Sequence, residues 1–263
     1  MIDTVAILDI AVQAGQAILD VYQRDFEVQH KADASPLTEA DLAAHRCIVA
    51  ALEELTPNIP VLSEESTAIP YEQRRVWSRY WLIDPLDGTK EFVRRNGEFT
   101  VNIALIEDGK PTLGVVHVPV TGVSYLGEVG IGAWKCQPDG TQAPIAVETT
   151  CQRPVRVVAS RSHLSEAVQA MLERIGDHQL VSMGSSLKLC LVAEGQADLY
   201  PRLGPTSEWD TAAAQAVVVA AGGQVTDCRM QPLGYNQKDS LLNPHFLVFA
   251  DAQVDWAQYL VLD

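Results

Sequence analysis

The chain has few cysteines, and their spacing favours neither disulfides nor a zinc site. Five cysteines are an odd number, and no two of them form a C-x-x-C pair. This pattern excludes a disulfide framework and indicates a reducing compartment. We therefore expect a cytoplasmic protein in which the thiols act as small buried hydrophobes. The cysteines are Cys47, Cys136, Cys151, Cys190 and Cys228.

Basic residues are scarce as well. Nineteen lysines and arginines stand against 34 acidic residues, which gives a net charge of −15. Such a surface repels nucleic acid polymers and anionic membranes, so neither is expected as a partner. A small phosphorylated substrate would also be repelled unless a bound divalent cation reversed the local field.

Long apolar runs and a leader pattern are also missing. Residues 1–6 show no basic region followed by an apolar block, so we expect no signal peptide. The most apolar stretch, residues 212–223, contains Gln215 and is too short to span a bilayer. We expect a buried helix there and no transmembrane segment, although peripheral association with the inner membrane stays open.

The periodicity of the apolar residues predicts two halves. The first, residues 1–150, is expected to be an α+β half with an antiparallel sheet, and the second, residues 151–263, an α/β half. The Asp108-Gly109 pair predicts a hairpin between two of the strands. We expect helices at 2–22, 38–55, 165–175, 185–193 and 209–221, and strands at 61–63, 80–83, 99–106, 112–118, 123–126, 133–135, 155–160, 180–183 and 197–201. A loop is expected at 33–36, helix or loop at 71–80, and a polar seam at 137–153.

The residues most typical of chemistry run from Asp84 to Phe92, with the sequence DPLDGTKEF. Two carboxylates follow an apolar strand at positions i and i+3, Pro85 keeps the chain extended, and Gly88 permits a tight turn. The good helix formers after Thr89 predict a helix whose first amides could bind an anion. Oxygen ligands beside a phosphate site are what Mg²⁺ prefers. The alternative is an ordinary turn in which Asp87 caps the helix.

Two other acidic motifs do not fit. An EF-hand loop with Gly88 at its sixth position would require acids at Ile83 and Arg94. The phosphatases that form a phosphoaspartate use D-x-D, whereas two residues separate Asp84 from Asp87.

Three motifs resemble, in order, those of the inositol monophosphatase superfamily of metal-dependent, lithium-sensitive phosphatases. They are Leu62–Ser66 (LSEES), Asp84–Phe92, and Glu208–Ala213 (EWDTAA). Lys90-Glu91, together with residues 184–188 (GSSLK) and 193–200 (AEGQADLY), is similar to the 3′(2′),5′-bisphosphate nucleotidase branch, the CysQ type. The resemblance covers nearly the whole chain. It implies an alternating α/β/α/β/α layered sandwich.

The resemblance also implies the site residues. Two or three Mg²⁺ ions would be bound by the carboxylates of Glu64, Asp84, Asp87 and Asp210 and by the carbonyl of Leu86. Glu64, Leu86, Asp87, Gly88, Thr89 and Asp210 would contact the substrate. Asp41 would hydrogen-bond Thr89, and these two residues, with Glu64, would take the proton of the attacking water. His163, Ser185, Lys188 and Arg202 are predicted contacts to the rest of a nucleotide.

The implied reaction is hydrolysis of 3′-phosphoadenosine 5′-phosphate to AMP and phosphate during sulfate assimilation, with 3′-phosphoadenosine 5′-phosphosulfate as a second substrate. No covalent intermediate is required. Inositol monophosphatase or fructose-1,6-bisphosphatase activity is an alternative within the superfamily. A non-catalytic regulator that binds a metal or a nucleotide is an alternative of another class. Monomer and homodimer both stay open.

Each site residue also has a purely structural interpretation. Asp41 could complete a capping box with Thr38, Glu64 and Glu65 could form a solvated strand end, and Asp210 could favour a helix N-terminus. Lys188 and Arg202 could be surface cations, and His163 could cap a helix.

Five carboxylates gathered in one cleft would raise one another's pKa values, and bound cations would relieve that repulsion. The five carboxylates are those of Asp41, Glu64, Asp84, Asp87 and Asp210.

Overall fold

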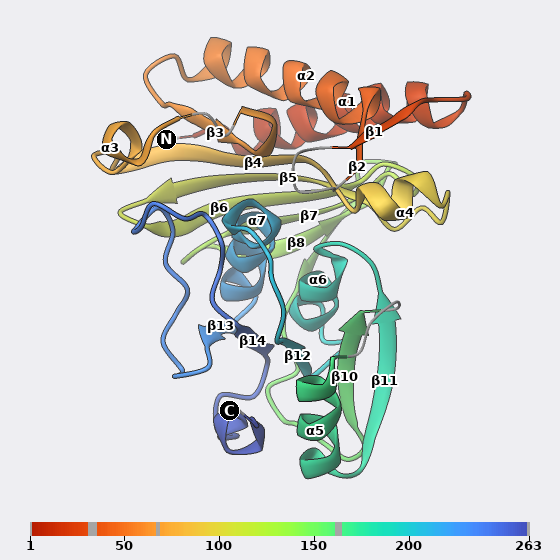
Figure 1. The fold of residues 1–263 in the computed structure, drawn as a ribbon, viewed down its shortest axis with the longest axis vertical. Helices are drawn as coiled ribbons and strands as arrows, with labels where there is room; N and C mark the ends of the chain where they lie inside the picture. Colours follow the sequence, from red (N-terminus) through yellow and green to blue (C-terminus); the bar gives the residue numbers. More distant parts are fainter. Residues whose placement is uncertain (1, 31–35, 67–68, 161–164, 262–263) are drawn as a thin grey trace.

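The computed structural model describes residues 2–30, 36–66, 69–160 and 165–261, which form two large β-sheets, one two-stranded sheet and three helical layers. Along the view of Figure 1, α1 and α2 lie on one sheet, α6 and α7 lie between the two sheets, and α5 lies beyond the second. The predicted alternating α/β/α/β/α sandwich is therefore confirmed. The predicted loop at 33–36 falls mostly outside the described residues.

The first sheet has seven strands in the order β3-β4-β5-β6-β7-β8-β9. All pairs are antiparallel except β3 and β4, which run parallel. The predicted hairpin joins β5 to β6 through Asp108 and Gly109, both at positive φ. The strands are β3 (Val61–Ser63), β4 (Arg79–Asp87), β5 (Thr100–Glu107), β6 (Lys110–Val118), β7 (Val123–Glu128), β8 (Gly132–Cys136) and β9 (Gln142–Ile145).

The second sheet has five strands in the order β11-β10-β12-β14-β13. Its strands are β10 (Val155–Ser160), β11 (His178–Met183), β12 (Leu199–Arg202), β13 (Gln224–Asp227) and β14 (Phe246–Phe249). The helix α5 (Glu166–Ile175) and the short helix η2 (Trp256–Tyr259) pack on its outer face. The strands of the two sheets lie on opposite sides of residue 150. The division of the chain into two halves there stays a prediction.

Helices α1 (Thr4–Tyr22) and α2 (Glu39–Leu55) cover the outer face of the first sheet. The carboxylate of Asp3 caps α1 by accepting hydrogen bonds from the amides of Val5 and Ala6. By length and apolar composition α1 could cross a membrane. One apolar face of the helix is, however, buried against α2 and the sheet, Ile7 and Ile18 completely, while Val5 and Val12 are exposed. This packing accounts for the hydrophobicity of the buried face.

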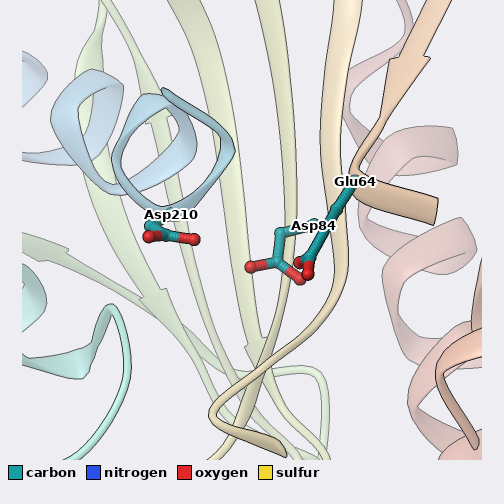
Figure 2. A group of neighbouring side chains, drawn as sticks. All are labelled: Glu64, Asp84 and Asp210. Atoms are coloured by element: carbon teal, nitrogen blue, oxygen red, sulfur yellow. The ribbon is translucent and has the colours of Figure 1, made fainter. Parts of the chain in front are cut away.

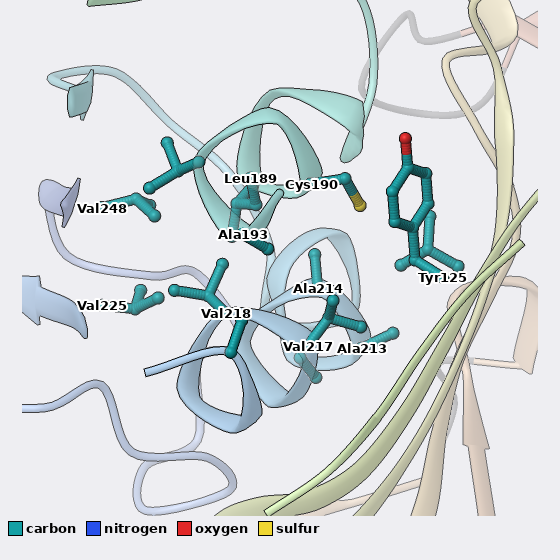
Figure 3. Packing of buried hydrophobic residues seen from close by; sticks show 14 of the residues in the cluster. Tyr125, Leu189, Cys190, Ala193, Ala213, Ala214, Val217, Val218, Val225 and Val248 are labelled. Atoms are coloured by element: carbon teal, nitrogen blue, oxygen red, sulfur yellow. The ribbon is translucent and has the colours of Figure 1, made fainter. Parts of the chain in front are cut away.

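Helices α6 (Leu187–Ala193) and α7 (Glu208–Ala220) fill the layer between the sheets. Figure 3 shows Tyr125 of the first sheet on one side of them and Val225 and Val248 of the second sheet on the other. The contact is tight, because a Cβ at Gly114 would lie 2.1 Å from the carbonyl oxygen of Ala213. The alanine-rich α7 thus rests directly on the sheet backbone, which fixes the helix N-terminus near the end of β4.

Several boundaries differ from the prediction. β4 does not end before Asp84 but continues to Asp87, with a register shift between these two residues that accommodates Pro85. The region 137–153 was predicted to be a seam and contains β9, while β13 and β14 were not predicted. Helix α6 begins at Leu187, because Ser185 has φ +44. β12 begins at Leu199 and not at Ala197.

Five short elements complete the described chain. The first strands, β1 (Val28–His30) and β2 (Pro36–Thr38), form a separate antiparallel pair. The short helix η1 (Glu64–Ser66) follows β3, and α3 (Tyr71–Arg74) precedes β4. The short helix α4 (Thr89–Val93) follows β4.

All five cysteines are free thiols. Cys136 and Cys190 are buried, and the other three are half-buried.

Candidate metal centre and active site

Three carboxylates from distant parts of the sequence meet at one point. Glu64 follows β3, Asp84 lies in β4, and Asp210 lies in the first turn of α7. One carboxylate oxygen from each lies within 4.8 Å of the others. Figure 2 shows Glu64 and Asp84 side by side, with Asp210 facing them from α7. Because β3 and β4 run parallel, Glu64 and Asp84 lie at the same end of the sheet.

Electrostatics at this cluster are unfavourable to three bare negative charges. Burial, followed by the charge of Glu64, raises the pKa of Asp84 well above its usual value. Burial and the charge of Asp87 raise the pKa of Asp210 to about 8. A partly buried set of hard oxygen donors that repel one another fits a hard divalent cation, which stabilises the charged forms.

Asp87 is not a member of this three-carboxylate group, although it lies close enough to interact with it electrostatically. Its Oδ2 atom accepts a hydrogen bond of 2.6 Å from the Ser186 amide. Burial raises the pKa of Asp87 to about 6, against the opposite effect of the Lys188 charge and the Ser186 hydrogen bond. Asp87 therefore links the acidic cluster to α6.

The turn after β4 holds Thr89 against Asp41. The Thr89 hydroxyl lies 3.3 Å from Asp41 Oδ1 and 3.4 Å from the Leu86 carbonyl oxygen. Gly88 has φ +93, and a Cβ there would lie 3.2 Å from the Glu98 carbonyl oxygen, so the turn requires glycine. The predicted helix after it, α4, is only five residues long.

For two of the acids, the structural and the functional interpretation hold together. Asp41 Oδ2 accepts hydrogen bonds of 2.7 Å from both the amide and the hydroxyl of Thr38, which completes the capping box of α2. The other oxygen of Asp41 is the one that faces Thr89. Asp210 likewise accepts from the Ser207 amide at 2.8 Å and caps α7. Capping fixes the orientation of each carboxylate.

A cleft of about 710 Å³ opens beside the acidic cluster. Its wall carries Asp87 and Asp210 on the metal side and Ser185 on the α6 side. Among the residues that the structure describes, four cations line it despite the net charge of −15: Lys90, Arg94, Lys188 and Arg202. A cationic wall next to an acidic metal centre suits a substrate with more than one phosphate.

The predicted nucleotide contacts are only partly described. Lys188 donates a hydrogen bond to the Ser185 carbonyl and lies 5.7 Å from the centre of the Tyr200 ring. Arg202 donates to the carbonyl of Pro205 at 2.8 Å. Within the described residues, no group hydrogen-bonds the buried Ser185 hydroxyl. His163 lies outside the described residues.

Several residues at the cleft were not predicted from the sequence as site residues. Lys90 and Glu91 were noted only as part of a family motif, and Arg94 was not considered as a substrate contact. Ser186 was also missed, although its amide binds Asp87. Lysines and arginines beside the motif could have been found from the charge pattern. Ser186 has no signal of its own in one sequence.

A profile of the inositol monophosphatase family matches residues 2–254, and the chain belongs to this family. The predicted resemblance is thus confirmed. The chain is 54% identical over 244 residues to the 3′(2′),5′-bisphosphate nucleotidase CysQ of Salmonella typhimurium, covering 92% of this chain and 97% of that protein. It is 53% identical over 250 residues to the enzyme of the same name from Escherichia coli, covering 94% and 99%.

Solved structures agree. CysQ from Bacteroides thetaiotaomicron, a bacterial member of the inositol monophosphatase family, superposes with a TM-score of 0.83 at 43% identity, covering 94% of this chain and 96% of that one. The suhB protein of Bartonella henselae shares the fold, with a TM-score of 0.78 at 24% identity and coverage of 97% and 96%.

The raised pKa values predict how stability depends on pH. An acid whose pKa is higher in the folded state stabilises the fold below its unfolded pKa, near 4, and this contribution is lost as the pH rises towards the folded pKa. For Asp87 this loss takes place between about pH 4 and about pH 6. For Asp210 it takes place between about pH 4 and about pH 8. Bound cations would offset the loss.

We therefore expect the increase in Tm produced by saturating MgCl₂ to be larger at pH 8 than at pH 5, by on the order of 5 °C. Differential scanning fluorimetry with MgCl₂ and with EDTA measures it. Asp210→Asn should reduce this pH dependence and raise the Tm of the metal-free protein. An increase in Tm that is equal at both pH values would contradict the assignment of these charges.

Proposed function

We propose that this protein is a Mg²⁺-dependent phosphomonoesterase that hydrolyses 3′-phosphoadenosine 5′-phosphate to AMP and phosphate. The observation that supports it most is the convergence of Glu64, Asp84 and Asp210 beside a cleft lined by cations. The names of relatives more than 50% identical over nearly the whole chain support the choice of substrate. The role would be to remove a by-product of sulfate assimilation in the cytoplasm. 3′-Phosphoadenosine 5′-phosphosulfate is a second candidate substrate.

We assign the binding of two or three Mg²⁺ ions to Glu64, Asp84, Asp87, Asp210 and the Leu86 carbonyl. When bound, such ions neutralise phosphoryl charge and lower the pKa of water. The amides of Gly88 and Thr89, with Asp87, are assigned to the ester phosphate. These residues lie at the turn after β4, next to the carboxylate cluster.

We assign Thr89 and Glu64 the role of removing the proton of the attacking water. The Thr89 hydroxyl donates to Asp41, so its oxygen can accept a hydrogen bond from water. Asp41 is itself fixed by Thr38, which gives Thr89 a defined orientation. The carboxylate of Glu64 would then accept the proton. The proposal requires no serine or cysteine nucleophile and no covalent intermediate.

The second phosphate is assigned to Lys188 and Arg202. We expect Lys188→Met to raise the KM for 3′-phosphoadenosine 5′-phosphate by about 10- to 100-fold, the cost of a charge-assisted hydrogen bond. The KM for adenosine 3′-monophosphate should change much less, since it lacks that phosphate. Arg75→Gln is the control, because Arg75 pairs with Glu72 away from the cleft. Equal effects on both substrates would remove Lys188 from this role.

Parallel phosphate-release assays test the function. We expect the highest kcat/KM for 3′-phosphoadenosine 5′-phosphate with MgCl₂, and no release with EDTA. A preference for inositol 1-phosphate or fructose 1,6-bisphosphate would favour the alternative within the family. Metal or nucleotide binding without any phosphate release would favour a non-catalytic regulator.

A further inference from the structure

Two carboxylates attach the turn before α6, residues 184–186, to the first sheet. One is Asp87 at the end of β4, and the other is Glu98 just before β5. The Gly184 amide donates to Glu98 Oε2 at 2.8 Å, and the Ser186 amide donates to Asp87 Oδ2 at 2.6 Å. The approach is close, because a Cβ at Gly184 would lie 2.8 Å from the Glu98 carbonyl oxygen. The same turn presents Ser185 to the cleft. One short segment therefore contacts both the metal centre and the cleft.

The side chain of Ser186 makes a second attachment. Its hydroxyl donates to Asn102 Oδ1 at 2.8 Å and lies 2.9 Å from the Thr100 hydroxyl. Since Ser186 has one hydrogen and gives it to Asn102, Thr100 must donate to Ser186. The resulting chain of hydrogen bonds runs Thr100 to Ser186 to Asn102. All three residues are at most 2% exposed, so water does not compete.

The position of this chain relative to the acids is specific. In the pairing of β4 with β5, Thr100 lies opposite Asp87, and Asn102 lies opposite Asp84. The Ser186 hydroxyl is thus hydrogen-bonded to Thr100 and Asn102. On the neighbouring strand these two residues lie opposite Asp87 and Asp84, which are proposed metal ligands. The Ser186 amide holds one of those ligands directly.

We infer that Ser186 is a positioning residue for Asp87: its hydroxyl locks the 184–186 turn onto β5, so that its amide orients the Asp87 carboxylate for a divalent cation. This inference rests on the proposed function, in which Asp87 binds metal. Groups that orient metal ligands typically change metal affinity or activity by 10- to 100-fold when they are removed. It also makes the geometry of the cleft depend on the geometry of the metal centre.

Calorimetric titration with Mn²⁺ on the full chain tests it. We expect Ser186→Ala to weaken Mn²⁺ binding about tenfold. Ser124→Ala is the matched control, because Ser124 is equally buried, lies in the sheet that the 184–186 turn contacts, and hydrogen-bonds His117 away from the site. It should lower the Tm of the metal-free protein to a similar extent and leave Mn²⁺ affinity unchanged. Unchanged affinity in Ser186→Ala, or equal weakening in both variants, would overturn the inference.

A pair of substitutions at Thr100 gives an independent test if Ser186→Ala does not fold. Thr100→Val keeps the shape and removes the donor to Ser186, so it should weaken Mn²⁺ binding several-fold. Thr100→Ser keeps the donor and should bind like the wild type. Equal binding by both overturns the inference. Failure of the wild type to bind Mn²⁺ would instead reject the proposed function, which separates the two claims.

Discussion

Asp87→Asn is expected to lower Mg²⁺-dependent phosphate release by on the order of 10³-fold, with the fold intact. The amide side chain has the same shape, and its oxygen can still accept the hydrogen bond from Ser186. What it loses is the negative charge that the cation and the developing transition state require. Burial raises the pKa of Asp87 to about 6, so its charge is unfavourable in the metal-free protein. Removing that charge should therefore not destabilise the metal-free protein.

The measurement is kcat at saturating substrate over a series of MgCl₂ concentrations, with Tm recorded in parallel. Asp251→Asn is the matched control, because Asp251 is also largely buried and accepts a hydrogen bond from the Cys151 amide. Asp251 belongs neither to the acidic cluster nor to the wall of the cleft. This control should retain full activity. Wild-type turnover by Asp87→Asn at saturating Mg²⁺ would falsify the role given to Asp87.

The second large effect is expected from the Thr89 hydroxyl. Thr89→Val should lower kcat by about 10²- to 10³-fold, because the oxygen that orients the attacking water is lost. The β-branched shape is kept, so the turn at Gly88 should persist. Thr89→Ser, which keeps the hydroxyl, should retain most of the activity.

Metal binding separates this role from a structural one. Mn²⁺ affinity should be nearly unchanged in Thr89→Val, in contrast to Asp87→Asn, where it should fall. A loss of activity in Thr89→Val that is matched by an equal loss of Mn²⁺ affinity would place Thr89 in the support of the metal site and not in proton transfer.

The local parts of the fold could be predicted from the sequence. The β5–β6 hairpin follows from an Asp-Gly pair between two apolar runs, and α1 and α2 follow from helical periodicity. β4 was predicted too short, because the apolar run ends at Ile83, although the strand continues through Pro85. The sheet accommodates it at the register shift between Asp84 and Asp87. β9 (QAPI) lies at the sheet edge and is mostly exposed, so no alternation of apolar and polar residues reveals it.

The candidate site was predictable as a set of residues but not as a geometry. Spacing alone placed Asp84 and Asp87 together, and only the family resemblance implied that Glu64 and Asp210 join them. The structure shows the means: parallel pairing of β3 with β4, and the packing of α7 on Gly114. Ser186 was beyond reach, because its partners Thr100 and Asn102 are distant in sequence and small polar residues have many other roles.

The most direct test of the account is a crystal of this protein grown with Mn²⁺ and measured near the manganese absorption edge. We predict anomalous density between the carboxylates of Glu64, Asp84 and Asp210, with further density beside Asp87. Density at other acidic residues only, or none at an occupancy-saturating Mn²⁺ concentration, would contradict the claim that these distant side chains form a metal centre.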